Sequence, residues 1–450
     1  MNDKFSKIGF VLAVAGSAVG LGNAWKFPTL VGQNGGSAFV LLYLFLTLGV
    51  GFVIFLAELS IGKLSEKDPV NAYYTLAPKH KRAWSIVGFS LIGAILIVSF
   101  YSVIIGWIVK YAYFGFFPLP KSIEESSAIF GNLLSNDVLS QFICFTFVFI
   151  VIFYVVSKGV KSGIEKLNVW MMPSLFILLI LMLGYSFSMD GFSKASEFLF
   201  SPDFSKLGVG AFLSALGLAC FSLSIGVGSI ITYSASLPDK TNFITSTINI
   251  IIINIIIGIM MGLIVFTFIF EFNGNPAQQG PGLIFVSLMS LFSNIDPIGF
   301  LPLGNILAIA FFIALFFAGI TSAVSMIEPL TFYLINSYNF TRKKALIFIA
   351  FIVYFLGSLC ILSGIEWSKD SLEFFGKSFF DILDFIASNL MMPLGGLFGA
   401  IFVGFVLKKE ALQTLFYPYM RGKYFECWYF FVRYISPLAV ILIMIKQLFF

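Results

Sequence analysis

The residues best suited to binding chemistry lie within Gly16–Pro28, in an apolar segment long enough to cross a bilayer. This stretch contains the helix breakers Gly20 and Gly22, followed by an amide, Asn23, and a cation, Lys26. In hydrocarbon each unpaired backbone N–H or C=O costs several kcal/mol, so a broken helix is tolerated only where it is buried in protein or lines a cavity. An ionisable residue at that depth indicates a functional site. We therefore predict half of a binding site for a small solute and its coupling ion.

A second stretch, Phe221–Ser229, repeats this pattern, with the hydroxyls of Ser222 and Ser224 beside Gly226 and Gly228. Interrupted helices at corresponding positions in two halves of a membrane protein are the best sequence indication of an inverted-repeat transporter site. Unwound carbonyls there can bind small cations, and half-helix N-termini favour a carboxylate. A zwitterionic solute suits such a site.

Each of these features also has a purely structural interpretation. Gly16 and Gly20 form a small-xxx-small pattern that commonly serves helix packing. Ser222 and Ser224 can donate to a carbonyl one turn earlier in their own helix. The repetition of the pattern, together with Asn23, favours the functional interpretation.

The composition is that of a polytopic membrane protein. Of 450 residues, 59% are hydrophobic and 11% are charged, whereas soluble domains carry about 25% charged residues. The net charge of +5 is spread over short polar gaps between apolar runs and gives no basic face for nucleic acid. The four cysteines have no CxxC spacing, and the only histidine is His80. We therefore expect no disulfide framework, no His-rich metal site and no Ser-His or Cys-His enzyme.

Apolar runs of about 20 residues, the length needed to cross a bilayer, predict eleven membrane helices. We expect them at 8–33 (broken), 37–62, 83–117, 138–157, 163–189, 208–236 (broken), 241–272, 302–336, 342–365, 374–407 and 424–449. The long connector 273–301, rich in glycine and proline, is interpreted either as an outer lid or as a structureless linker.

Basic residues mark one side of the membrane. They are Lys63, Lys67, Lys79, Lys81, Arg82, Lys158, Lys161, Lys166, Arg342, Lys343, Lys344, Lys408, Lys409, Arg421 and Lys423, whereas the opposite loops are mainly acidic. The positive-inside rule places the N-terminus in the cytoplasm, and an odd number of helices places the C-terminus outside. Lys4 and Lys7 before Ala13–Ala15 mimic a signal peptide, but the apolar run continues past the apparent cleavage site.

Several motifs occur in order along nearly the whole chain. Besides Gly16–Pro28, they are Asn34–Gly36, Ala57–Gly62, Phe317–Ser322, Asp384–Gly396 and Arg433–Pro437. Together they resemble the neurotransmitter:sodium symporter family, typified by the bacterial leucine transporter. In that transporter the solute and its coupling ions bind at the broken helices.

The resemblance implies an all-α polytopic fold, with a leucine-transporter-like 5+5 inverted repeat, broken helices 1 and 6 and about eleven transmembrane helices. The repeats would cover about 8–190 and 207–407, with an additional helix at 424–449, all in one transporter domain, 1–450. It further implies sodium-coupled import of an amino acid by alternating access. The protein would be multi-pass in the bacterial cytoplasmic (inner) membrane, with the lipid bilayer and the substrate as partners.

Two sodium sites follow from the resemblance. The first would use the Ala18 carbonyl, Asn23, Ser222 and Asn254 with the substrate carboxylate, and Asn249 competes with Asn254 if the register differs. The second would use carbonyls of Gly16, Val19 and Ala318 and hydroxyls of Thr321 and Ser322. All the protein ligands would be neutral oxygens.

The implied substrate pocket consists of Ser17, Ala18, Leu21, Gly22, Ile97, Tyr101, Phe221, Ser222, Ser224, Val227, Ser322, Ser325 and Met326. Tyr101 would bind the substrate carboxylate and form an aromatic lid with Phe221; a buried tyrosine bonded to backbone is the alternative. Val227 stands where the leucine transporter has phenylalanine. The apolar compartment predicts a hydrophobic or aromatic amino acid.

Departures from the family concern the gates and chloride. Lys26 and Asp384 occupy the positions of the family's outer-gate pair. Most members have arginine where this chain has Lys26, and a lysine cannot form a bidentate fork with a carboxylate. We expect a looser or water-mediated pair. Gly258 replaces a chloride-binding serine or a compensating acid, while Tyr43 matches another chloride-site residue. Chloride dependence and proton antiport are therefore left open.

On the inner side, Asn336 stands where the family has aspartate, and Lys4 and Lys7 are the nearest candidates for its missing partners. Glu328 is either an inner-gate or proton-transfer group, or a structural carboxylate bonded to neighbouring helix ends. Gly163 and Pro173 bracket the start of the fifth helix, and we expect them to let it unwind there and admit water to the second sodium site.

Two other functions are compatible with parts of the sequence. A channel would need a continuous polar path, whereas the polar residues here cluster at mid-depth beneath aromatic ones. A sodium-dependent amino-acid sensor of the same fold would bind its ligand without flux.

Overall fold

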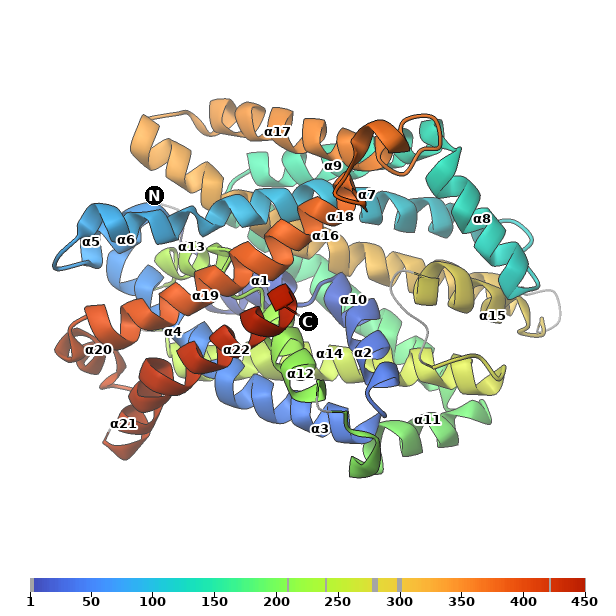
Figure 1. Ribbon diagram of the computed structural model, residues 1–450, viewed down its shortest axis with the longest axis horizontal. Helices are drawn as coiled ribbons and strands as arrows, with labels where there is room; N and C mark the ends of the chain where they lie inside the picture. Colours follow the sequence, from blue (N-terminus) through green and yellow to red (C-terminus); the bar gives the residue numbers. More distant parts are fainter. Residues whose placement is uncertain are drawn as a thin grey trace.

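The computed structural model describes residues 4–208, 210–238, 241–276, 282–297, 302–420 and 422–449. The sequence features at Gly280, Pro281, Gly299 and Arg421 lie outside the described residues. Within the described ranges the chain is a bundle of helices with one short β-hairpin (Figure 1). The predicted all-α class is confirmed.

Nine helical spans in the described chain are long and apolar enough to cross a membrane: Ser37–Ser65, Lys81–Phe114, Val138–Ser157, Val160–Ser186, Phe243–Glu271, Leu303–Tyr338, Arg342–Leu362, Phe379–Val406 and Lys423–Lys446. Their main helices are α3 (Ser37–Leu46), α4 (Phe52–Ser65), α6 (Lys81–Val87), α7 (Leu91–Phe114), α9 (Val138–Ser157), α10 (Lys166–Ser186), α14 (Phe243–Glu271), α16 (Leu303–Tyr338), α17 (Arg342–Leu362), α18 (Phe379–Asp384), α19 (Met392–Ile401), α21 (Lys423–Phe430) and α22 (Ser436–Phe449).

Two further segments are broken helices. Helix α1 (Lys7–Ala18) bends by 62° into the stretch Gly22–Gln33, which starts as a π-helical turn. Helices α12 (Ala211–Ser222) and α13 (Ser229–Ala235) are separated by the non-helical residues 223–228. With the first pair counted as one span, the described chain has ten spans of membrane length, one fewer than the eleven predicted, because α12 alone is too short to count as a span. The two broken segments stand first and sixth, as expected.

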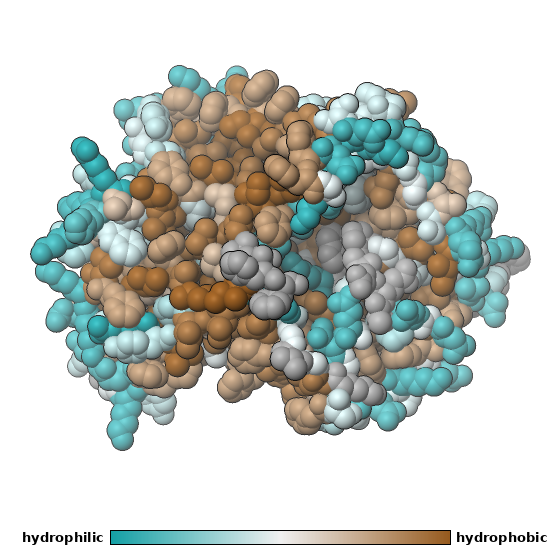
Figure 2. Space-filling view, viewed as in Figure 1, coloured by the Kyte–Doolittle hydropathy of each residue, from teal (hydrophilic) through white to brown (hydrophobic). Residues whose placement is uncertain are grey.

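Polar residues start the helices, and apolar residues carry them through the membrane. The side chains of Ser6, Asp137 and Thr341 accept backbone N–H groups in the first turns of α1, α9 and α17, which satisfies donors that have no partner within the helix. Phe45 and Phe351 are exposed to 73% and 74%, and Figure 2 shows a broad apolar belt between two hydrophilic ends. An apolar surface of this extent is that of a protein surrounded by lipid.

The connector 273–301 is not structureless in its described part. Leu283–Ser293 is helical and includes α15 (Met289–Ser293). The ring of Phe285 stacks on that of Phe130, with centroids 5.1 Å apart. This packing favours a folded outer segment over a loose linker.

Shorter helices gather at the two ends of the bundle (Figure 1). With α15, helices α8 (Ile123–Ser135) and α11 (Gly191–Phe200) lie at the end of the acidic loops. Helices α5 (Pro69–Leu76) and α20 (Lys409–Phe416) lie at the end of the basic loops.

The tenth span begins later than the predicted residue 374, at Phe379. Strands β1 (Glu373–Phe374) and β2 (Lys377–Ser378) pair there as an antiparallel hairpin. Its turn includes Gly376 with a φ of +73°. A right-handed helix cannot pass through this left-handed conformation, so the prediction was wrong at this boundary.

Candidate functional site

The first break changes how the backbone of α1 is hydrogen-bonded. The amide of Gly20 turns back to the Ala18 carbonyl at 3.0 Å instead of continuing the helical pattern. The next amide, that of Leu21, donates to the hydroxyl oxygen of Tyr101 on α7 at 2.8 Å. The α-helical pattern therefore ends at Val19, which releases carbonyls of the preceding turn for other partners.

The second break depends on glycine. Gly226 and Gly228 have φ values of +90° and +79°, which glycine adopts without steric cost. A Cβ on Gly226 would also overlap the carbonyl oxygen of Met392 on α19. The amide of Gly226 donates to Oε1 of the buried Glu58 on α4 at 2.8 Å. Glu58 was not among the predicted site residues, although an acid within an apolar span was a signal for it.

Ser17 lies where both breaks meet α16. Its carbonyl oxygen accepts hydrogen bonds from the Ser224 hydroxyl at 2.8 Å and the Ser322 hydroxyl at 3.1 Å. Its own hydroxyl oxygen accepts from Ser325 at 2.8 Å. These four predicted pocket residues are thus brought together from three separate segments, and all are buried.

Residues predicted for the first sodium site also converge. The Asn23 side-chain nitrogen donates to Asn254 Oδ1 at 2.7 Å, and the Asn254 nitrogen donates to Ser222 Oγ at 3.2 Å. Tyr43 joins them, with its hydroxyl 3.2 Å from Ser222 Oγ. Asn254 is fully buried, whereas the alternative Asn249 is exposed.

One oxygen in this cluster has no partner. Asn23 Oδ1 is buried and accepts no hydrogen bond. A buried unsatisfied acceptor costs free energy unless a ligand satisfies it. Neutral amide and hydroxyl oxygens fit a hard monovalent cation, so the donor set is suited to sodium.

Residues predicted for the second sodium site lie where α1 meets α16. Thr321 Oγ1 donates to the Phe317 carbonyl at 2.9 Å, which leaves its lone pairs available. A Cβ on Gly16 would lie 3.1 Å from the Thr321 Cβ, so the two helices approach closely here. Ala318 is buried one turn before Ser322 on the same helix. These oxygens also fit a small cation.

Apolar residues of the predicted pocket surround the polar ones. Ile97, Val227 and Met326 are exposed to 6% or less. Phe221 packs so closely on Gly22 that a Cβ there would lie 2.7 Å from its ring.

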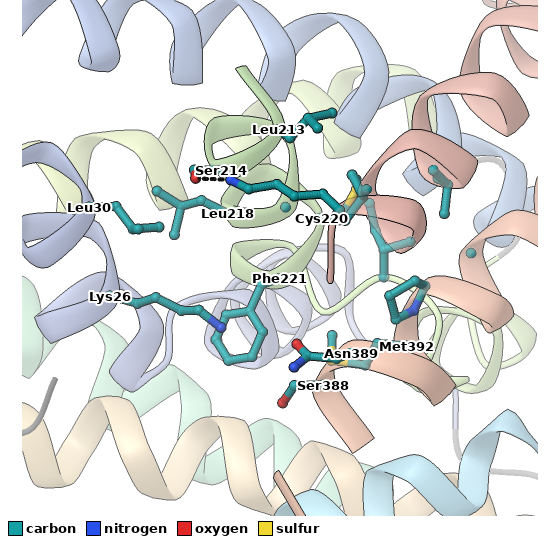
Figure 3. A pocket seen from close by; sticks show the side chains of 17 residues that line it. Lys26, Leu30, Leu213, Ser214, Leu218, Cys220, Phe221, Ser388, Asn389 and Met392 are labelled. Atoms are coloured by element: carbon teal, nitrogen blue, oxygen red, sulfur yellow. Dashed lines mark hydrogen bonds between the residues drawn. The ribbon is translucent and has the colours of Figure 1, made fainter. Parts of the chain in front are cut away.

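The predicted outer-gate pair does not form an ion pair in this structure. The Lys26 ammonium lies 3.7 Å from the centroid of the Phe221 ring (Figure 3), while Asp384 accepts a hydrogen bond from Ser388 at 2.7 Å. Lysine has a single ammonium rather than a fork, and a ring face attracts it from close range. The expected Lys26–Asp384 contact is therefore replaced by a cation–π contact.

Lys26 and Phe221 line a pocket of about 320 Å³, together with Ser388, Asn389 and other residues of α12, α19 and α22 (Figure 3). This outer pocket is mostly apolar. Sequence reasoning did not anticipate it, because its lining comes from four separate parts of the chain.

On the inner side, Glu328 is bound by Arg342 at the start of α17. One guanidinium nitrogen donates to Oε1 at 3.0 Å and the other donates to Oε2. Arg342 also donates to the Val156 carbonyl at 2.8 Å. Of the two interpretations of Glu328, these contacts favour the structural carboxylate.

The other inner-gate candidates are separate from Glu328. Asn336 donates to Asp68, which starts α5, at 3.1 Å. Lys4 lies 3.8 Å from Glu66, and Lys7 is exposed.

Comparison with known proteins agrees with this arrangement. The profile of the sodium:neurotransmitter symporter family matches residues 2–126 and 121–449. The sodium-dependent transporter YhdH of Bacillus subtilis is 35% identical over 447 residues, covering 98% of this chain and 96% of that protein. A sodium-dependent transporter of Haemophilus influenzae is 32% identical over 457 residues, covering 99% and 97%.

A solved structure is also similar over the whole length. The crystal structure of MhsT in complex with L-phenylalanine has a TM-score of 0.87 and 34% identity, and covers 99% of this chain and 100% of that one. The fold is that of the bacterial leucine transporter, with broken first and sixth helices. This chain is therefore a member of the sodium:neurotransmitter symporter family, whose proteins are sodium-coupled transporters and not enzymes.

Proposed function

We propose that this protein imports a hydrophobic or aromatic amino acid together with sodium ions by alternating access. The observation that carries the proposal is the unpartnered, buried Asn23 Oδ1 beside Asn254 and Ser222 at the first helix break. A cation at this point satisfies the oxygen and brings positive charge to the place where a substrate carboxylate would bind.

Two sodium ions take part in the proposed cycle. Ala18, Asn23, Ser222 and Asn254 hold the first together with the substrate carboxylate, and Gly16, Val19, Ala318, Thr321 and Ser322 hold the second. The second ion would join α1 to α16. Each ion drives transport only through its different affinity for the outward-open and inward-open states, because equal binding to both shifts nothing.

The substrate would lie against the broken helices. Tyr101 accepts from the Leu21 amide, so its own O–H can be donated to the substrate carboxylate. The Ser17 carbonyl region is suited to the ammonium group. Ile97, Val227 and Met326 offer an apolar surface to the side chain, and the L-phenylalanine bound to the similar MhsT supports an aromatic or other large apolar substrate.

Outer closure would involve an aromatic lid. Phe221 already lies on Gly22 and beneath Lys26, and we propose that it covers the substrate together with Tyr101. The Lys26 ammonium would hold the Phe221 ring in its closed position, and Asp384 would remain separate.

We further propose that the whole chain, 1–450, is one transport domain in the bacterial cytoplasmic membrane, with a cytoplasmic N-terminus and an external C-terminus. The excess of lysine and arginine in the loops at the α5 and α20 end supports this orientation.

Uptake by the purified protein in liposomes tests the proposal. With sodium outside and potassium inside, radioactive L-phenylalanine or L-leucine should accumulate above its external concentration, and the accumulation should disappear when potassium replaces sodium. Accumulation that is equal in both salts would refute sodium coupling. Sodium-dependent binding without accumulation would instead identify a sensor, and fast non-saturable flux would identify a channel.

A further inference from the structure

Helix α10 brings an amide to the place where α1 meets α16. Asn168 is fully buried, and its side-chain nitrogen donates to the Ile164 carbonyl at 2.8 Å. This hydrogen bond fixes the direction of the carboxamide. Its oxygen, Oδ1, is buried and has no hydrogen-bond partner.

The free oxygen of Asn168 is directed at Gly16. A Cβ built on Gly16 would overlap Asn168 Oδ1 and would lie 3.1 Å from the Thr321 Cβ. Only a glycine allows the three helices to approach this closely. The oxygen therefore lies beside two residues of the proposed second sodium site, one on α1 and one on α16.

A second contact holds the residue just before α10 against the start of α1. The hydroxyl and amide of Ser6 donate to the Glu165 carboxylate at 2.5 and 3.1 Å, and Gly9 leaves room for that carboxylate. The Ser6–Glu165 contact and the close approach at Gly16 therefore both fix the position of Asn168 along α1.

A buried carboxamide oxygen that accepts no hydrogen bond destabilises the folded state. A small cation satisfies such a group together with its neighbours. We infer that Asn168 supplies a further oxygen ligand to the second sodium ion, from α10. This inference rests on the proposed second site and extends its ligand set from two helices to three.

The test uses sodium titration of the purified protein without substrate. Melting temperature and binding of radioactive sodium are measured in wild type and in Asn168→Leu, which keeps the branched shape of the side chain but has no oxygen. The sodium concentration for half-maximal stabilisation should rise at least about tenfold in Asn168→Leu. Asn168→Asp, which keeps an oxygen at the same place, should retain sodium binding.

A matched control lies on the same helix. Ser186 is fully buried and donates to the Met182 carbonyl, so Ser186→Ala loses a buried hydrogen bond far from Gly16 and should titrate as wild type. If Asn168 has only a structural role, Asn168→Leu should lower the melting temperature equally in sodium and in potassium. If Asn168 is a sodium ligand, the substitution should lower the melting temperature more in sodium.

The outcomes separate the two proposals. If wild type responds to sodium and Asn168→Leu responds at the same concentrations, the role of Asn168 is refuted and the proposed function stands. If wild type does not respond to sodium at all, both are refuted. Should Asn168→Leu not fold, Asn168→Ala takes its place in the same titration.

Discussion

At the scale of single residues, the asparagines of α14 differ sharply in their surroundings. Asn254 is buried and bonded to Asn23 and Ser222, whereas Asn249 is exposed. Asn254→Ala should raise the sodium concentration for half-maximal substrate binding by about tenfold or more, since the proposed ligand and a positioning hydrogen bond are lost together. Substrate binding titrated with sodium measures this.

Asn249→Ala is the matched control, because it removes the same chemical group from the same helix on its outer face. It should bind substrate with the sodium dependence of wild type. Equal effects of the two substitutions would contradict the assignment of Asn254.

Much of the candidate site could be predicted residue by residue, because the motifs that carry it are short and local. Side-chain direction could not. Lys26 sits at the expected gate position, but its ammonium turns to the Phe221 ring, which comes from a distant helix. The unpartnered oxygen of Asn168 comes to lie against Gly16 only when α10 packs on α1.

At the scale of elements, the break between α12 and α13 depends on Gly226 and Gly228 at positive φ, and Gly226 is the more closely packed of the two. Gly226→Ala would force a Cβ onto a φ of +90° and into the Met392 carbonyl. The conformation alone costs about 1–2 kcal/mol, and the overlap adds to it. We expect a clear fall in melting temperature and loss of substrate binding.

Gly258, which lies within the continuous helix α14, provides the comparison. A Cβ there meets nothing within 4 Å, so Gly258→Ala should leave the melting temperature at or slightly above that of wild type, because alanine favours the helix. Similar losses in the two variants would show that the break does not depend on the conformation of Gly226.

Most spans were predictable because apolar runs of membrane length leave the chain few alternatives. The exceptions are informative. The hairpin before Phe379 replaces the first residues of the tenth predicted helix, because the turn at Gly376 adopts positive φ. The sequence of the connector 273–301 allows either a lid or a linker and does not reveal its helix Leu283–Ser293, because the packing of that helix on Phe130 depends on another segment.

At the scale of the whole molecule, Glu328 and Arg342 join α16, α17 and the end of α9. Their side chains are exposed to 1% and 24%. Glu328→Ala or Arg342→Ala leaves a largely buried charge without its partner, which typically costs about 3–5 kcal/mol. The melting temperature should fall strongly in both single variants and by less than the sum in the double variant.

The exposed pair Lys409–Glu426, joined at 2.7 Å, is the control. Its side chains are exposed to 37% and 53%, so Lys409→Ala should change stability by at most about 1 kcal/mol. If Lys409→Ala lowered the melting temperature as much as Arg342→Ala, the burial of the Glu328–Arg342 pair would not explain its contribution to stability.

Two exposed lysines at opposite ends of the bundle test the orientation. In a cysteine-free background, Lys121→Cys, just before α8, should react with a membrane-impermeant maleimide on intact cells. Lys79→Cys, between α5 and α6, should react only after the membrane is opened. The reverse pattern would invert the proposed topology.

The wall of the outer pocket carries a free thiol, Cys220, immediately before Phe221, the residue proposed as a lid. With Cys144, Cys360 and Cys427 replaced by serine, this thiol is the single target for alkylation. We expect a water-soluble reagent applied from outside to reach it faster when Phe221 moves away from Gly22. The alkylation rate would therefore report the fraction of molecules that face outward. Its dependence on sodium and amino acid can be measured without a substitution at Phe221.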